Sequence, residues 1–161
     1  MENALNNNEV TLKEEVIALR RVAKVLKGGR RFAFSAIVAV GDGKGNVGIG
    51  SGKSREVPDA IRKAINNAKK NMFTVPIING TIPHEIYVKY KASKILMKPA
   101  APGTGLIAGV NIRPILSCAG ITDILTKSLG SNTVVTLVKA VEIALKSLKT
   151  KDYIDNLKKA E

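Results

Sequence analysis

A glycine-rich stretch, GDGKGNVGIGSGKS at residues 41–54, is the part of this sequence whose residue spacing could bind phosphate. Backbone N–H groups of such loops cradle nucleotide phosphates, and a G-x-G-x-x-G string starts at Gly43. The dinucleotide motif requires a helix after its glycines, whereas the alternation that follows predicts a strand. The ending Gly52-Lys53-Ser54 resembles a Walker A loop, but that loop requires a glycine where Val47 stands. These mismatches favour a glycine-rich hairpin over a nucleotide site.

Residues that could support catalysis are few and scattered. The sequence has one histidine, His84, and one cysteine, Cys118, so neither a zinc cluster nor a Ser-His-Asp type of triad can be assembled from them. We interpret His84 as a surface residue and Cys118 as a buried, inert thiol. The carboxylates of Asp42, Glu56 and Asp59 flank predicted turns and a helix start, where capping explains them. We therefore expect no enzyme activity, no cofactor and no metal.

The charge balance is the strongest functional signal in the composition. Lysine and arginine total 26 against 13 acidic residues, which gives a net charge of +13 and a pI near 10. This excess is larger than solubility requires and predicts a polyanionic partner, of which nucleic acid is the usual one. Between Val16 and Arg55 only Asp42 opposes nine basic residues. Glycines in the same region would let an RNA backbone approach the main chain closely.

Aromatic residues make up only 4% of the chain. Phe32 and Phe34 fall on the face of a predicted strand that should point to the core, so the sequence does not predict a base-stacking platform for single strands. Contact with the backbone and grooves of folded RNA fits better.

Length and hydropathy limit the number of domains and the expected location of the protein. A chain of 161 residues with 45% hydrophobic composition can form one ordinary domain or two small ones. No apolar run approaches the roughly 20 residues that cross a bilayer, and the start MENALNNNEV lacks the features of a signal peptide. We expect a cytoplasmic protein with no membrane contact. A single cysteine excludes an internal disulfide.

The first half of the chain reads as strands and one helix. Residues 1–10 are Asn-rich and predicted to be disordered. The apolar positions of residues 16–27 fit both a helical stripe and a short strand, with a weak preference for helix. Period-two alternation predicts a strand up to Val40, with Phe32, Phe34, Ala36, Val38 and Val40 on one face. A hairpin turn at residues 41–46 leads into a second strand. A helix is predicted near Pro58, with an apolar stripe of Ile61, Ala64, Ile65, Ala68 and Met72.

The second half begins after a pattern break. A short strand is predicted at residues 72–78, followed by a candidate boundary at residues 79–83. Strands at 85–91 and 94–98 should pair with each other. The apolar segment 106–119 contains Pro114, which predicts a helix that starts late or bends, and Gly120 should end it. A strand at 121–125 and a final helix from Val134 to Leu148 complete the pattern.

Four strings carry a resemblance to a known family: LKGGRRF at 26–32, VGDGKGNVGIGSGKSREVPDAI from Val40, KPAAPGTGLIAG from Lys98 and AGITDILTKSLGSN from Ala119. In these strings, and over about residues 14–148, the chain resembles the S-five family of bacterial small-subunit ribosomal proteins. The resemblance implies an α+β fold. Residues 13–78 would form a β-sheet plus helix domain similar to a double-stranded RNA-binding domain, with a strand at 16–27. Residues 79–150 would form the two-layer α/β domain named after the family. A disordered N-terminal segment at 1–12 and a C-terminal tail at 151–161 would flank the two domains.

The resemblance also implies a function. Members are structural constituents of the small ribosomal subunit that bind its rRNA at the neck and body, with the loop Lys27-Gly28-Gly29-Arg30 reaching toward the head. They support assembly and decoding accuracy, line the mRNA entry path, and contact the neighbouring small-subunit proteins four and eight. A cytoplasmic, ribosomal protein without a small-molecule substrate is therefore expected. A free-standing double-stranded RNA-binding protein or RNA chaperone remains the alternative. A nucleotide-dependent kinase is a third hypothesis, because PGTGLIAG resembles a kinase glycine loop, but the Ser-rich continuation is absent.

Specific residues follow from the resemblance and from the charge concentration. The RNA-facing candidates are Arg20, Arg21, Lys24, Lys27, Gly28, Gly29, Arg30, Arg31, Lys44, Lys53, Arg55 and Arg62, of which Arg20 and Lys44 rest on charge alone. The candidates for contact with protein four are Gly103, Thr104, Gly105 and Arg113. Three positions depart from the family pattern: Val134 and Thr136, where Pro and Asn are usual, and Pro114. Val134 and Thr136 lie at the start of the last predicted helix, and Pro114 lies near the start of the helix before it.

Overall fold

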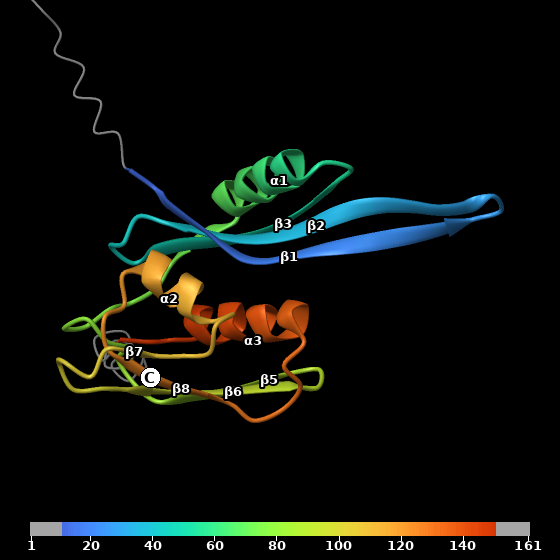
Figure 1. The fold of residues 1–161 in the computed structure, drawn as a ribbon. Helices are drawn as coiled ribbons and strands as arrows, with labels where there is room; N and C mark the ends of the chain where they lie inside the picture. Colours follow the sequence, from blue (N-terminus) through green and yellow to red (C-terminus); the bar gives the residue numbers. More distant parts are fainter. Residues whose placement is uncertain (1–10, 151–161) are drawn as a thin grey trace, which may run out of the picture.

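The computed structural model describes residues 11–150, so the predicted disordered segment up to Val10 and the tail 151–161 lie outside the described residues. Within them the chain forms two four-stranded sheets and three helices in four layers: helix α1, a first sheet, helices α2 and α3, and a second sheet (Figure 1). The predicted α+β fold with two sheet-plus-helix units is confirmed.

The first sheet is antiparallel throughout, with strand order β1-β2-β3-β4. Its strands are β1 (Lys13–Leu26), β2 (Gly29–Gly41), β3 (Asn46–Ser54) and β4 (Met72–Thr74). The helical preference for residues 16–27 is wrong, and the strand implied by the family resemblance is right. The reason is pairing: β1 is hydrogen-bonded to β2 along its whole length, with a bulge at Ile17 that turns this side chain into the core.

Helix α1 (Val57–Lys70) covers one face of the first sheet and explains half of the glycine-rich stretch. Its buried residues are Ala60, Ala64 and Ala68, which recur once per turn. Opposite them, β3 carries glycines at alternating positions 48, 50 and 52, and a Cβ on any of them would overlap the carbonyl oxygen of one of these alanines. Small residues on both elements thus bring the helix backbone against the strand.

The second sheet has the order β5-β6-β8-β7, with β7 parallel to β8. Its strands are β5 (Ile86–Tyr90), β6 (Ser93–Pro99), β7 (Leu106–Ile107) and β8 (Ile124–Ser128). The predicted pairing of the strands near 85–91 and 94–98 is confirmed, whereas the strand predicted at 121–125 lies three residues later. The strand predicted at 72–78 is shorter than expected and ends at Thr74.

Helices α2 (Arg113–Ala119) and α3 (Val134–Lys146) lie between the two sheets (Figure 1). Pro114 sits in the first turn of α2, where its missing N–H has no helical partner, so the predicted late start is confirmed. The last helix is also confirmed. Its N-cap, Thr133, makes no side-chain cap, but Thr136 Oγ1 donates to the Thr133 carbonyl at 3.0 Å and hydrogen-bonds Ser93 Oγ at 2.7 Å. Thr136 therefore ties the start of α3 to β6.

One hydrophobic core joins the two units. Ile17, Ala39 and Val47 of the first sheet are buried in the same cluster as Ile115 and Leu116 of α2. Cys118 belongs to this cluster and is fully buried, as predicted, and burial raises the pKa of its thiol to about 11. The boundary predicted at residues 79–83 falls between β4 and β5, but the division into domains 13–78 and 79–150 stays a prediction, because the core is shared.

The other half of the glycine-rich stretch closes against the C-terminus of α2. The N–H groups of Gly43 and Gly45 donate to the carbonyl oxygens of Cys118 and Ala119 at 3.0 and 2.9 Å. The Asp42 carboxylate holds the turn by accepting from the backbone N–H groups of Lys44 (2.7 Å) and Asn46 (3.0 Å). The N–H groups of Gly43 and Gly45 therefore bind helix carbonyls, and those of Lys44 and Asn46 bind Asp42, so none of them is left for a phosphate.

Gly120 offers a direct test of this contact. Its φ is +87°, and a Cβ would overlap the carbonyl group of Gly43. We expect Gly120→Ala to lower the free energy of unfolding by about 2 kcal/mol or more, because it combines left-handed strain with a backbone overlap. In a thermal melt the midpoint should fall by about 5 °C or more. Gly109→Ala is the matched control, since a Cβ at Gly109 meets nothing within 4 Å. Equal melting temperatures for the two variants would contradict the contact.

Candidate nucleic-acid interface

A two-stranded arm extends from the first sheet. Strand β3 stops pairing with β2 at Phe34, and beyond this point β1 and β2 continue alone to their turn at residues 27–28. At a rise of about 3.3 Å per residue, the unsupported part is about 17 Å long. Figure 1 shows this hairpin projecting well past α1. We call residues 20–35 the arm, a range that includes the last positions at which β3 still pairs with β2.

All twelve RNA-facing candidates are exposed. The structure places eight of them on the arm: Arg20, Arg21, Lys24, Lys27, Gly28, Gly29, Arg30 and Arg31. Lys53 and Arg55 lie at the arm's base, at and just beyond the end of β3, and Arg62 follows on the exposed surface of α1. Lys44 lies apart from the others, because it occupies the turn at the opposite end of β2, about 40 Å along the strand. The structure thus gathers eleven candidates and separates one. Their contact with RNA stays a prediction.

The arm carries positive charge on both faces. Side chains alternate along a strand, so Arg20, Lys24 and Arg31 lie on the face turned away from α1. Lys24 and Arg31 are direct cross-strand partners, and Arg20 is opposite Ser35, which is in turn opposite Lys53. Like charges placed directly opposite one another destabilise a strand pair. An anion between them would remove that repulsion.

Most acidic residues of the described chain are paired away from the arm, while Glu56, next to Arg55, is exposed and forms no ion pair with a described residue. Glu14, Glu15, Glu85 and Glu142 pair with lysines outside the arm, at Lys69, Lys13, Lys98, Lys139 and Lys146. Of the eleven gathered candidates, only Arg62 has a described carboxylate in range, Asp59 at 3.8 Å. The charges of the arm are therefore available to an external partner.

The sequence-based placement of Phe32 in the core is wrong. Its ring lies on the same side of the sheet as α1, as alternation predicts, but it is 50% exposed because it lies on the arm, beyond the helix. The Arg21 guanidinium lies over this ring, 4.7 Å from its centroid. Phe34, two residues closer to α1, does pack against the alanine cluster. Periodicity identified the face but not the length of sheet that α1 covers.

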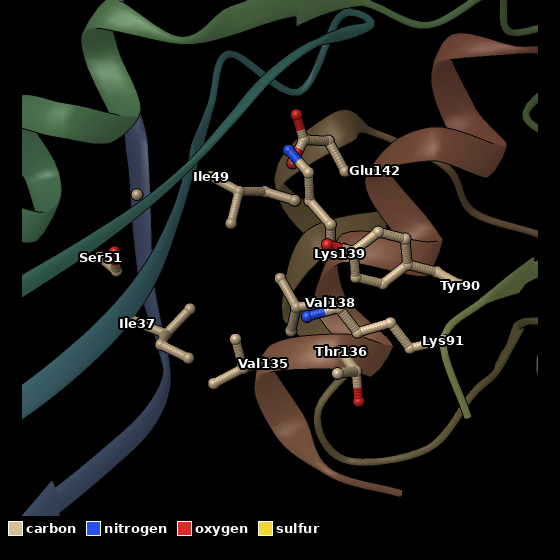
Figure 2. Close-up of a pocket in the computed structure, with 11 residues that line it drawn as sticks. Ile37, Ile49, Ser51, Tyr90, Lys91, Val135, Thr136, Val138, Lys139 and Glu142 are labelled. Carbon is tan, nitrogen blue, oxygen red and sulfur yellow. Dashed lines mark hydrogen bonds and ion pairs between the residues drawn. The ribbon is translucent and has the colours of Figure 1, made fainter. Parts of the chain in front are cut away.

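A groove between the first sheet and α3 shows no arrangement suited to catalysis (Figure 2). It has a volume of about 290 Å³ and apolar walls that include Ile37, Ile49 and Val138. Its one carboxylate, Glu142, accepts hydrogen bonds from Lys139 at 2.9 Å and from Lys146 at 2.6 Å. Burial raises the pKa of Glu142, but these lysines outweigh it and leave the pKa lowered. A carboxylate held in this way is a poor proton acceptor.

The histidine has a structural role as well, because both of its ring nitrogens contact the backbone. His84 Nε2 accepts from the Lys149 N–H at 3.2 Å, and Nδ1 lies 2.8 Å from the Glu85 carbonyl oxygen. No group of three His, Cys, Asp or Glu side chains in this range could hold a metal ion. None of its helices is long and apolar enough to cross a membrane.

The predicted protein-contact residues lie around a loop that Asp123 supports. Gly103 and Gly105 have φ values of +89° and +79°, and the Asp123 carboxylate accepts from the Gly105 N–H at 2.8 Å and from Thr122 Oγ1 at 2.8 Å. These hydrogen bonds, the Gly105 one first, lower the pKa of Asp123, which is only 7% exposed. Arg113 is exposed and donates to the Ala108 carbonyl at 3.2 Å. Sequence analysis missed Asp123 because its partner is 18 residues away.

Comparison with known proteins identifies the relatives of this chain. The family described as "Ribosomal protein S5, N-terminal domain" matches residues 12–76, and "Ribosomal protein S5, C-terminal domain" matches residues 88–158. A curated relative from Chloroflexus aurantiacus, named "Small ribosomal subunit protein uS5", is 53% identical over 144 residues. The alignment covers 89% of this chain and 81% of the relative.

The support of loop 103–105 by Asp123 should depend on pH. The folded-state pKa of Asp123 is lower than its ordinary value of 3.8, so its stabilisation is present above that value and is lost as pH falls through the folded pKa. We expect Asp123→Asn to melt below the wild type at neutral pH, and the difference to shrink below about pH 4. Asp59→Asn is the control and should change the melting temperature little, because the Asp59 side chain is 48% exposed and its ion pair with Arg62 is long, at 3.8 Å. A wild-type advantage that stays constant down to strongly acidic pH would rule out the carboxylate's role.

Proposed function

The chain belongs to the ribosomal protein S5 family, and we propose that it acts in the small ribosomal subunit as a rigid bridge between rRNA, held by its arm, and a neighbouring protein. Membership makes it a ribosomal protein and a structural constituent rather than an enzyme, located in the ribosome in the cytoplasm. The kinase hypothesis is therefore wrong.

The observation that carries the rRNA proposal is the charge on the arm. Lys24 and Arg31 face one another without a carboxylate in the described chain to separate them, and Arg20 and Lys53 extend the same face. RNA phosphates supply the missing anions, and exposed Gly28 and Gly29 allow a backbone to approach the tip. The arm is long and narrow, which suits insertion between folded RNA segments.

The second part of the bridge is the surface around Gly103, Thr104, Gly105 and Arg113. Asp123 holds this loop from beneath, and the shared core fixes α2 and its Arg113 relative to the first sheet. We propose that the arm binds rRNA at the neck while this surface contacts protein four, with protein eight also adjoining the second unit. A fixed distance between the two contacts would support assembly and couple RNA position to decoding accuracy.

In the proposed arrangement, the basic residues at the base of the arm also line the mRNA entry path. Arg55 and Arg62 lie beside the arm's base and are exposed, so they could meet a single strand that passes the neck. The alternative, a free-standing double-stranded RNA-binding protein or RNA chaperone, shares the arm but has no use for a supported loop at 103–105. Affinity for isolated duplexes compared with affinity for assembling subunits separates the two.

Neutralising one face of the arm tests the rRNA contact. We expect the triple variant Arg20→Gln, Lys24→Gln and Arg31→Gln to bind small-subunit rRNA more weakly, with a log-log salt slope reduced by about 2.7, or about 0.9 for each lost phosphate contact. Salt titrations of the full chain measure this slope. The control removes the same charge from the second sheet: Lys89→Gln, Lys94→Gln and Lys127→Gln.

Incorporation into small subunits gives the second readout of the same variants. The arm variant should be depleted from subunits on sucrose gradients at moderate salt, while the second-sheet variant co-sediments as the wild type does. Equal slopes and equal incorporation for the two triple variants would show that net charge alone, and not the arm, holds the RNA.

A further inference from the structure

The face of the arm on the α1 side differs in chemistry from the opposite, phosphate-suited face. Val25 and Phe32 are 75% and 50% exposed there, and Leu19, just before the arm on the same face, is 43% exposed; the other described phenylalanines are partly buried. A half-exposed ring on the unsupported part of a basic hairpin contributes little to the fold. Its exposure therefore calls for a partner outside the chain.

The geometry around Phe32 is that of a stacking platform. Phe34 anchors β2 by packing against the α1 alanines, and Phe32 follows on the same face two residues further out. Arg21 is the cross-strand partner of Phe34, and its guanidinium lies 4.7 Å from the centroid of the Phe32 ring. A planar cation and an aromatic ring are thus held together on a short, paired stretch of sheet. Both groups offer flat surfaces on which a nucleobase can stack.

The surrounding charge favours RNA over a protein as the partner. Arg21 and Arg30 are exposed on this face, opposite Phe34 and Val25, and the sequence has no acidic residue between Val16 and Gly41. An apolar protein surface placed against Phe32 would leave these cations to be neutralised separately. A nucleotide brings its own phosphate beside its base, and so satisfies the ring and the cations together.

We propose that Phe32 and Arg21 form a stacking site for an unpaired nucleobase of RNA, while the opposite face of the arm holds phosphates. The site rests on the proposed rRNA-binding function and adds a recognition rule to it: the arm prefers a duplex interrupted by an unpaired nucleotide over a continuous one. Phosphate contacts supply affinity that depends on salt, and the stacking contact supplies the preference, which salt affects little.

The test uses the full chain and two RNA probes. One is a continuous duplex of about 16 base pairs, the length that double-stranded RNA-binding domains span, and the other is the same duplex with one bulged 2-aminopurine. We expect the wild type and Phe32→Tyr to bind the bulged probe about tenfold more tightly and to quench its fluorescence. Phe32→Leu keeps the apolar bulk but removes the ring, and should lose both effects while its affinity for the continuous duplex stays within about twofold.

Val25→Ala is the matched control, because it shortens another exposed apolar side chain on the same face. It should behave as the wild type, and melting temperatures should agree for all variants because the arm lies outside the core. Loss of affinity for both probes in Phe32→Leu would mean that the ring only supports the arm, and the stacking site would be wrong. Normal RNA binding with poor incorporation into subunits would assign Phe32 to a protein contact and also overturn it. A wild type that binds neither probe nor small-subunit rRNA would instead defeat the proposed function.

Discussion

The closure of the 41–46 turn against the C-terminus of α2 is the contact on which the relative position of the two units depends. The last carbonyl groups of a helix have no partner within it, and here two of them lie buried at the junction, where water cannot reach them freely. Gly43 and Gly45 supply the missing donors. Gly41 and Gly120 allow the backbones to meet, because a Cβ on either would overlap the opposing chain. Side chains larger than hydrogen would separate the layers.

Nearby groups reinforce the same junction with polar contacts. Lys13 Nζ donates to Ser117 Oγ at 2.6 Å and pairs with Glu15 at 2.8 Å, which raises the pKa of Lys13. Ser117 Oγ in turn donates to Glu15 Oε1 at 3.2 Å. Strand β1 is thus fixed to α2 at the end where it enters the core. Since the same strand continues into the arm, the direction of the arm is set by the contact with α2.

The parts of the structure that could be predicted are those with a local, one-sided pattern. Alternation gave β2, the apolar stripe gave α1 and α3, and Pro114 and Gly120 marked the ends of α2. The prediction for residues 16–27 failed because their strand is exposed on both faces over much of its length, so neither face carries a consistent apolar pattern. The exposure of Phe32 depends on where α1 begins, and the role of Asp123 depends on a partner distant in sequence. No local pattern records either fact.

The arrangement separates stability from binding. The shared core and the glycine contacts hold the body, while the arm contributes few buried groups and carries the unfavourable Lys24–Arg31 pair. A directly opposed like-charge pair costs on the order of 0.2–1 kcal/mol. That cost is small beside the stability of a folded domain, about 5–15 kcal/mol, so the fold can carry it in the free protein. When an anion binds, the same repulsion is relieved, and its relief adds to the binding free energy. An arm that is slightly unfavourable alone is therefore more selective for its polyanionic partner than a neutral hairpin of the same shape.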